Sequence, residues 1–162
     1  MATASQARVV LDDCRKALTE LTDGLQGSDW RRRWVAAIAL LRSVGYVLKD
    51  VDRDTSETMS QAVDAEWHAL KNDEHKPEHA IFFGFIDDER NGVLHAYRFR
   101  AGQNITIDLN SKPPRETVSY SMNSGPFAGQ DPRELIRHGI KWWDRYLDRV
   151  ESRASGHEQN PS

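Results

Sequence analysis

The sequence predicts a mostly α-helical protein: a bundle of about five helices with a short β-hairpin-like insertion before the last one. Two observations carry this prediction. Apolar residues recur every three or four positions in several long segments, which is the spacing of an amphipathic helix. Near the C-terminal third, the stretches "NITIDLN" and "TVSYSMN" instead alternate between apolar and polar residues, which is typical of β-strands.

The first three helices follow from periodicity and capping residues. We expect the first over 5–23, where the glycines of "TDGLQGSD" end it. Asp29 is a good N-cap for the second, which is apolar around most of its circumference and therefore central in the bundle. Thr55 or Ser56 caps the third helix. The apolar positions of this third helix are Met59, Val63, Trp67 and Leu70.

The fourth helix is expected over 79–97, "HAIFFGFIDDERNGVLHAY". The insertion at about 103–122 follows it, and "SGPFAGQ" is a loop. Asp131 as N-cap and Pro132 in the first turn begin the last helix. We expect one domain over 1–152 and a disordered polar tail at 153–162. The apolar side of the fourth helix is predicted to contain Ile81, Phe82, Phe85, Ile86, Val93 and Leu94, extended by Tyr97, and that of the last Ile136, Ile140, Trp143, Leu147 and Val150.

Composition excludes several functional classes. The formal net charge of the 162 residues is −3, so the whole molecule has no general attraction to nucleic acid or anionic lipid. A single cysteine, Cys14, excludes an internal disulfide framework and a zinc site with several cysteines. The N-terminus does not resemble a signal peptide, and "WVAAIALL" is too short to span a membrane. We therefore expect a cytoplasmic protein without membrane contact.

Two stretches resemble metal sites, but neither is complete. "HKPEH" has the H-x-x-E-H order of one zinc protease class, yet Pro77 favours a helix start that leaves His75 outside the helix. "DVDRDT" opens like a calcium loop, but Thr55 and Gln61 stand where such a loop needs glycine and glutamate. We interpret them as a surface turn and an acidic linker, and we expect no metal or cofactor.

The last helix carries a basic residue at every fourth position, which forms a slowly winding stripe. Such a stripe suits a phosphate backbone. Acidic residues between the basic ones favour the other interpretation, a solvated face of salt bridges. The stripe consists of Arg133, Arg137, Lys141, Arg145, Arg149 and Arg153.

The most suggestive group of polar residues lies on the fourth helix. Asp87, Asn91 and His95 are four residues apart and line one edge, which Arg90 flanks. A histidine moves protons near neutral pH, an arginine stabilises charge on a phosphate, and an asparagine orients either group. These groups suit cleavage of RNA without a metal, with the ribose 2′-hydroxyl as the internal nucleophile.

The segment "RNGVLH", Arg90 to His95, resembles the Arg-polar-x-x-x-His motif of the HEPN superfamily. The resemblance implies a small all-α domain and, in many members, a metal-independent ribonuclease of toxin, antiviral or RNA-processing systems. It implies that Arg90 binds or polarises the scissile phosphate, that Asn91 orients it, and that His95 is the acid or base. It also implies a homodimer with the two motifs facing each other, RNA as substrate, and an antitoxin or other protein as a further partner.

Three hypotheses therefore stand: a HEPN-like endoribonuclease, a non-catalytic HEPN-like dimeric binding or regulatory module, and a helical protein of unrelated role. The first expects Arg90 and His95 to be free of internal acids and to lie in a cleft. The third expects Arg90 to pair with Asp87 and His95 to be buried against Tyr97 or Phe99. Arg42, which interrupts the second helix, is a further candidate for the same cleft.

Overall fold

A computed structural model of the chain describes residues 2–158. Within this range the elements, in order, are α1 (Ser5–Glu20), α2 (Gly27–Asp50), α3 (Glu57–Asn72), α4 (Asp88–Ala96), β1 (Ala101–Asp108), β2 (Arg115–Met122) and α5 (Pro132–Glu158). Short 3₁₀ turns occur at Asp52–Thr55 and Pro77–His79, and a π-helix at Phe82–Asp87. The predicted fold class, a mostly helical protein with a hairpin before the final helix, is confirmed.

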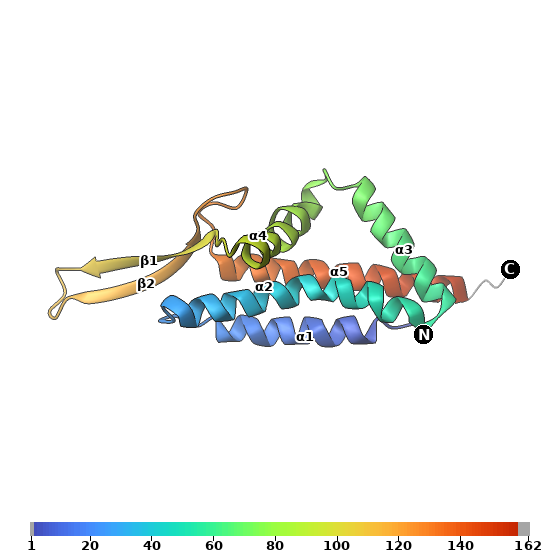
Figure 1. Cartoon of the computed structure of the whole chain (residues 1–162), viewed down its shortest axis with the longest axis horizontal. Coiled ribbons are helices and arrows are strands. Elements are labelled where there is room, and N and C mark those ends of the chain that lie inside the picture. Colours follow the sequence, from blue (N-terminus) through green and yellow to red (C-terminus); the bar gives the residue numbers. More distant parts are fainter. Residues whose placement is uncertain (1, 159–162) are drawn as a thin grey trace.

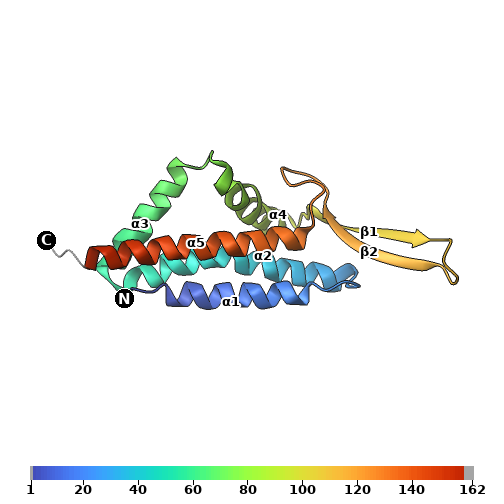
Figure 2. The same cartoon turned by 180° about the vertical axis from the view of Figure 1, so that it is seen from behind.

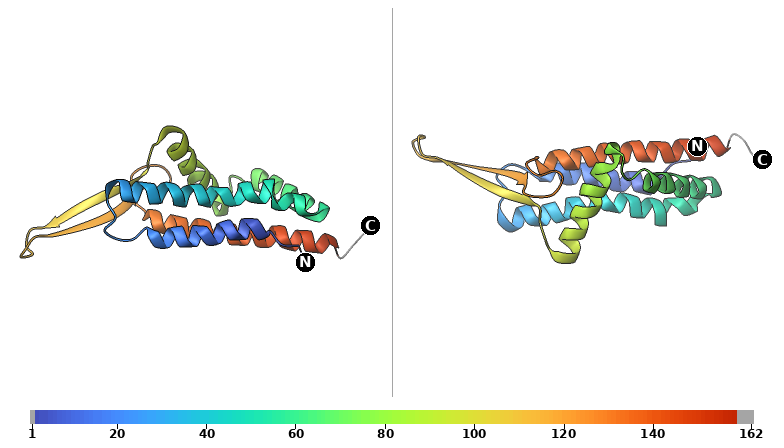
Figure 3. Two further views of the ribbon diagram at one scale, coloured as in Figure 1. Left: turned by 60° about the horizontal axis from the view of Figure 1, so that its bottom comes forward. Right: turned by 90° about the horizontal axis from the view of Figure 1, so that it is seen from above.

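Three helices form a long layer, and α3 and α4, with the π-helix before α4, cover one side of it. We call this cover the roof. Helices α1, α2 and α5 lie side by side along the length of the molecule, and α3 and α4 lean toward one another over one side of this layer (Figure 1). The view from behind shows the same arrangement (Figure 2). The two strands project as an arm beyond one end of the layer, which all views show (Figure 3). The candidate residues of the fourth helix therefore lie near the root of the arm.

Most helix starts agree with the sequence, and one differs. The Ser56 hydroxyl accepts a hydrogen bond from the Met59 N–H at 3.1 Å, and the Asp131 carboxylate accepts one from the Arg133 N–H at 2.8 Å, so both predicted caps are confirmed. Asp29 is not a cap, because α2 already begins at Gly27 and Asp29 lies in its first turn. There its carboxylate faces the positive end of the helix dipole.

The N-terminus of α1 is capped by a residue far along the chain. Asp52, fully buried in the turn after α2, accepts hydrogen bonds from the N–H groups of Gln6 at 3.0 Å and Ala7 at 2.7 Å. Its carboxylate satisfies two of the donors that a helix start leaves free. This contact fixes the start of α1 against the end of α2.

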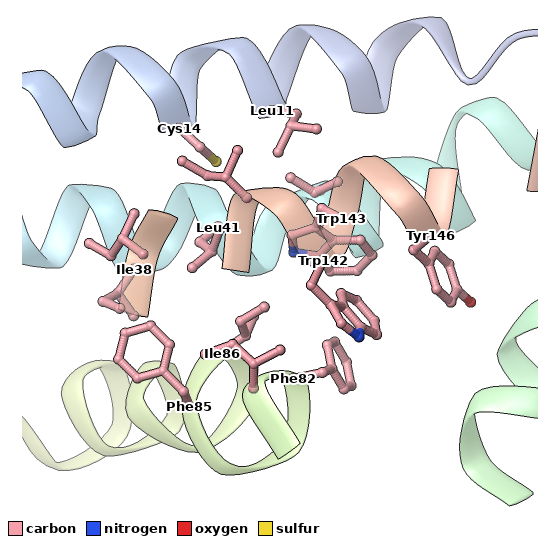
Figure 4. Close-up of a cluster of buried hydrophobic side chains, with 14 of the residues drawn as sticks. Leu11, Cys14, Ile38, Leu41, Phe82, Phe85, Ile86, Trp142, Trp143 and Tyr146 are labelled. Atoms are coloured by element: carbon pink, nitrogen blue, oxygen red, sulfur yellow. The ribbon is translucent and has the colours of Figure 1, made fainter. Parts of the chain in front are cut away.

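Aromatic and aliphatic side chains fill the space between the layer and the roof. Figure 4 shows Phe82, Phe85 and Ile86 pointing from the roof toward Leu41 of α2 and toward the two tryptophans of α5. The ring centres of Phe82 and Trp142 are 4.9 Å apart. The predicted apolar side of α5 is fully buried, as expected. Burial of such large side chains is the main force that holds the roof on the layer.

The hairpin arm has an anchored root and an exposed tip. Its strands pair antiparallel in a register from Ala101 opposite Met122 to Asp108 opposite Arg115. At the root, Tyr120 stacks on Trp30 of α2 with ring centres 4.4 Å apart. Farther out, Ile105 and Ile107 are more than half exposed. Because a two-stranded sheet is only marginally stable alone, the root contacts hold the arm in place.

The C-terminal boundary lies later than the sequence suggested. Helix α5 continues to Glu158, so residues 153–158, which we expected to belong to a disordered tail, are helical. Ala154 is buried, and this apolar contact extends the seam of α5 by one more turn. Residues 159–162 of the expected tail lie outside the described range. Of residues 2–158, no helix is both long and apolar enough to cross a bilayer.

Candidate functional site

The candidate residues lie on α4, which follows directly after the π-helix. Phe82, Phe85 and Ile86 of the π-helix are buried, and Val93 buries one side of α4. This anchoring leaves Arg90 and Asn91 half-buried and His95 exposed. The predicted single helix over 79–97 is therefore interrupted, and π-turns of this kind often accompany functional sites.

The π-helix also corrects the predicted apolar side. We expected Leu94 and Tyr97 to continue the buried face, but their side chains are 47% and 64% exposed. A π-turn adds a residue to the helical repeat, so the residues after it are rotated by roughly 100° from an uninterrupted α-helix. Tyr97 then adopts a left-handed conformation with φ 48° and ends the helix.

The three acids at the start of this segment are all bound by groups elsewhere in the fold. The Asp87 carboxylate accepts a hydrogen bond from Arg42 Nε at 2.9 Å, and Asp88 forms an ion pair with Arg100. Glu89 is 2% exposed and accepts hydrogen bonds at 3.3 Å from Trp34 Nε1 and from the backbone N–H of residue 100. Burial raises the pKa of Glu89 above its usual range. These acids are therefore not available to the cations that follow them.

Arg90 is consequently not paired with Asp87, contrary to the hypothesis of an unrelated role. Its Nη1 donates a hydrogen bond to Asn91 Oδ1 at 2.9 Å, and its guanidinium lies 5.5 Å from the centre of the Tyr46 ring. Among the described residues, no carboxylate forms an ion pair with Arg90. The guanidinium is thus oriented by an amide and an aromatic ring, and its charge is not neutralised.

His95 is exposed near the end of α4, and not buried against Tyr97 or Phe99. Those two aromatic rings instead contact each other, with centres 4.8 Å apart. In the part of the chain that the structure describes, the imidazole has no hydrogen-bond or ion-pair partner. The His95 side chain is therefore accessible to a molecule from outside.

The structure brings Arg90 and Asn91 into contact, but His95 does not join them. Arg90 and His95 are five residues apart on a helix, which places them about 140° apart around its axis. The five cavities described in residues 2–158 are lined by other residues. The cleft expected for a ribonuclease is therefore not among these five cavities.

Two arginines near the motif were not among the main predicted site residues. Arg42 was a further candidate, and it holds Asp87 and lies 4.2 Å from the Tyr46 ring centre. Arg98 was missed: its backbone N–H donates to the Gly92 carbonyl at 3.0 Å, and its side chain lies beside the same glycine. A Cβ at position 92 would be 3.3 Å from the Arg98 carbonyl oxygen, so glycine permits this close return. The basic stretch "RFR" just after the motif was the available signal.

The other candidate patterns lie elsewhere. His79 is buried, and its Nδ1 accepts a hydrogen bond from Trp142 Nε1 at 3.3 Å, so it serves the core of the roof. No group of three or more potential ligands among residues 2–158 is arranged to hold a metal ion. Cys14 is buried, and burial raises the pKa of its thiol to about 12, so the thiolate is scarce at neutral pH.

Comparison with known proteins adds no assignment, because no family model, curated protein or solved structure matches this chain.

Proposed function

We propose that the chain is a HEPN-like, metal-independent endoribonuclease that cleaves RNA by attack of the 2′-hydroxyl. The observation that supports this most directly is the hydrogen bond from Arg42 Nε to the Asp87 carboxylate. Because Arg42 holds this acid, neither Arg90 nor His95 has an acidic partner among the described residues. A half-buried guanidinium and an exposed imidazole on one short helix, neither with an acidic partner among the described residues, suit a phosphodiester substrate.

Each residue has a defined part in the proposed reaction. His95 accepts the proton of the 2′-hydroxyl or donates one to the departing 5′-oxygen, while Arg90 stabilises the charge that develops on the phosphate oxygens. Asn91 orients Arg90 through the hydrogen bond of 2.9 Å between them. The 2′-oxygen–phosphorus bond forms as the bond to the 5′-oxygen breaks, which gives a 2′,3′-cyclic phosphate and a 5′-hydroxyl.

The proposal includes a homodimer. Because Arg90 and His95 lie on different sides of α4, a second copy facing the first would supply the opposite wall of the cleft. Leu94 and Tyr97, both exposed beside the motif, offer apolar surface for such a contact. A cytoplasmic setting in toxin or defence systems, with a protein antitoxin as a further partner, belongs to the same proposal.

A non-catalytic dimeric binding or regulatory module is the second candidate. The exposed Leu94 and Tyr97 favour it, because they would serve a protein interface whether or not His95 transfers protons. The two candidates differ in their need for Arg90 and His95, which makes them separable by experiment.

The test is incubation of the purified protein with mixed RNA in EDTA. We expect wild-type protein to cleave, and Arg90→Ala and His95→Ala to lower the rate by about 10²- to 10⁴-fold, the usual contribution of acid–base catalysis. Matched controls are Arg137→Ala and His68→Ala, which remove the same side-chain types from exposed positions on α5 and α3. Both controls should cleave like the wild type.

Equal background cleavage by all five proteins would contradict the proposed ribonuclease. If the same protein sediments as a dimer, the second candidate takes its place. A Tyr97→Ser variant that sediments as a monomer would then locate the interface beside the motif.

A further inference from the structure

A cavity lies under the roof, next to the motif but separate from it. It opens between α2, α3 and α5 and has an internal volume of about 100 Å³. Its most prominent lining residues are four aromatic rings and two cations: Tyr46, Trp67, Trp143, Tyr146, Arg42 and Lys49. This is smaller than the usual pocket for a whole small-molecule ligand, so the cavity suits one small group of a larger molecule.

A glycine of α2 lets a buried tryptophan of α5 pack beside the cavity. A Cβ at position 45 would be only 2.7 Å from Cη2 of Trp143, so only glycine leaves room for this ring. Trp143 and Tyr146 belong to the buried cluster (Figure 4) and are only 1% and 2% exposed. Trp67 is partly buried and meets Phe82 edge-on, with ring centres 6.1 Å apart. Trp67 and Tyr46 are the lining rings with accessible surface, and such rings favour a planar, aromatic ligand.

The charge around the cavity is positive. Its acidic residue, Asp64, is held by Arg53 through two hydrogen bonds of 2.9 and 2.7 Å. Lys49 forms no ion pair among the described residues, and the Lys71 ammonium lies 5.6 Å from the centre of the Trp67 ring. The Lys49 charge acts on Asp64, but Arg53 already holds that carboxylate, so the rim keeps a net positive charge, which complements an anionic ligand.

One side chain belongs to both the cavity and the motif. Tyr46 lines the cavity, and the Arg90 guanidinium lies 5.5 Å from its ring centre. On the same ring, Arg42 lies at 4.2 Å and connects to Asp87. A ligand with a planar group in the cavity and a phosphate at its edge would thus reach Arg90 within one unit of its length.

We propose that this cavity binds a base of single-stranded RNA, stacked on Trp67, with the adjoining phosphates directed toward Lys49 and Arg90. The inference rests on the proposed ribonuclease function for its substrate class, and it adds a base-binding subsite to it. Stacking on an aromatic ring with phosphates on basic side chains is the common mode of single-strand binding.

The test measures binding without cleavage. A fluorescent single-stranded RNA in which every 2′-hydroxyl is methylated lacks the nucleophile, so its affinity is measured by anisotropy independently of catalysis. We expect Trp67→Leu to weaken binding about tenfold, the usual effect of losing one stacked base. Trp67→Phe keeps a ring and should recover most of the affinity, which loss of apolar packing alone would not explain.

A second pair of variants avoids any dependence on packing. Lys49→Glu reverses an exposed charge at the rim, and Lys16→Glu reverses one on α1, on the other side of the layer (Figure 1). We expect the first to weaken binding several-fold and the second to leave it unchanged. Equal effects of the two would overturn the subsite, because they would indicate general charge attraction.

The two proposals fail in different ways. Unchanged binding by Trp67→Leu overturns the subsite even if the wild type cleaves RNA. Binding that depends on Trp67, in a protein that cleaves no unmodified RNA in EDTA, supports the base subsite and contradicts the proposed cleavage.

Discussion

Two surfaces of this molecule carry basic side chains, and they differ in what their charges contact. The stripe on α5 consists of the six residues at 133, 137, 141, 145, 149 and 153, and four of these have acidic partners within the described chain. Arg133 pairs with Asp23 at 2.6 Å, and Arg137 pairs with Glu134. Arg149 and Arg153 both pair with Glu66. On α4, by contrast, the neighbouring acids are bound elsewhere in the fold, and Arg90 has none.

A run of basic residues therefore identifies a binding surface only where the neighbouring acids are bound elsewhere in the fold. The α5 stripe is longer, yet its charges connect helices: Glu66 belongs to α3 and Asp23 to the loop after α1. Two acids of α5 also bind another helix, because Arg8 of α1 pairs with Asp144 at 3.0 Å and with Asp148 at 2.6 Å. The pairing expected along α5 itself is found for Glu134 and Arg137, whereas most other ion pairs of this face join α5 to other elements.

Substitution of Glu66 is the strongest test of whether the ion pairs of α5 stabilise the fold. It is buried and holds both Arg149 and Arg153, so Glu66→Ala should lower the free energy of unfolding by roughly 2 kcal/mol, the cost of losing a buried, charged hydrogen-bond acceptor. Urea denaturation measures this loss. RNA cleavage by the folded protein should be unchanged, because the pair lies on α3 and α5 and not on α4.

Glu74→Ala is the control for that measurement, since it removes an exposed glutamate after α3. A variant at Glu66 that unfolds like the control would show that the α5 pairs contribute nothing to holding the helices together.

The sequence predicted the framework well, because long periodic segments and side-chain caps are local features. The seam of α5 and the caps at Ser56 and Asp131 are of this kind. The π-helix was not predictable, because "AIFFGFI" is apolar on every side and its periodicity does not distinguish an α-turn from a π-turn. The exposure of Leu94 and Tyr97 follows from that missed turn.

For the candidate site, the sequence predicted which residues share a helix but not which residue binds Asp87. The spacing placed Arg90, Asn91 and His95 on one helix, and all three lie there. The partner of Asp87 is Arg42, 45 residues earlier in the chain, and this contact depends on how α2 packs against the roof. Local spacing instead favoured the neighbour three residues away, Arg90, as the partner in the alternative hypothesis. Long-range ion pairs of this kind need the tertiary structure.

Two histidines differ in the same way as the two basic surfaces: His79 contacts α5 and is buried, whereas His95 on α4 is exposed. His79 is buried against Trp142 of α5, and burial lowers the pKa of its imidazole below the ordinary 6.5. As the pH falls below about 6.5, the unfolded chain takes up a proton that the folded chain resists, so the free energy of unfolding decreases. Wild-type protein should therefore lose stability from pH 7.5 to 5.5, by less than the Glu66 variant loses.

His79→Gln isolates that contribution, because glutamine keeps a hydrogen-bond acceptor for Trp142 and does not titrate. The decrease in urea midpoint on acidification should be smaller in this variant than in the wild type and in His68→Gln, which removes an exposed histidine. Identical pH dependence in all three proteins would contradict the assignment to His79.

The smallest expected effect concerns Arg98, which has no part in the proposed reaction and can be compared with an arginine of α5. Its side chain lies beside Gly92, is exposed, and forms no ion pair in the described range. If it contacts one RNA phosphate, Arg98→Ala should weaken binding of methylated RNA modestly and equally for all sequences. It should also lower the salt slope, log Kd against log salt concentration, by about 0.7 to 1, the value for one released counterion. Arg137→Ala, whose guanidinium is already neutralised by Glu134, should leave the slope unchanged. A slope that drops equally in both variants would mean that RNA senses the total charge of the protein and not the cations that the fold leaves without acids.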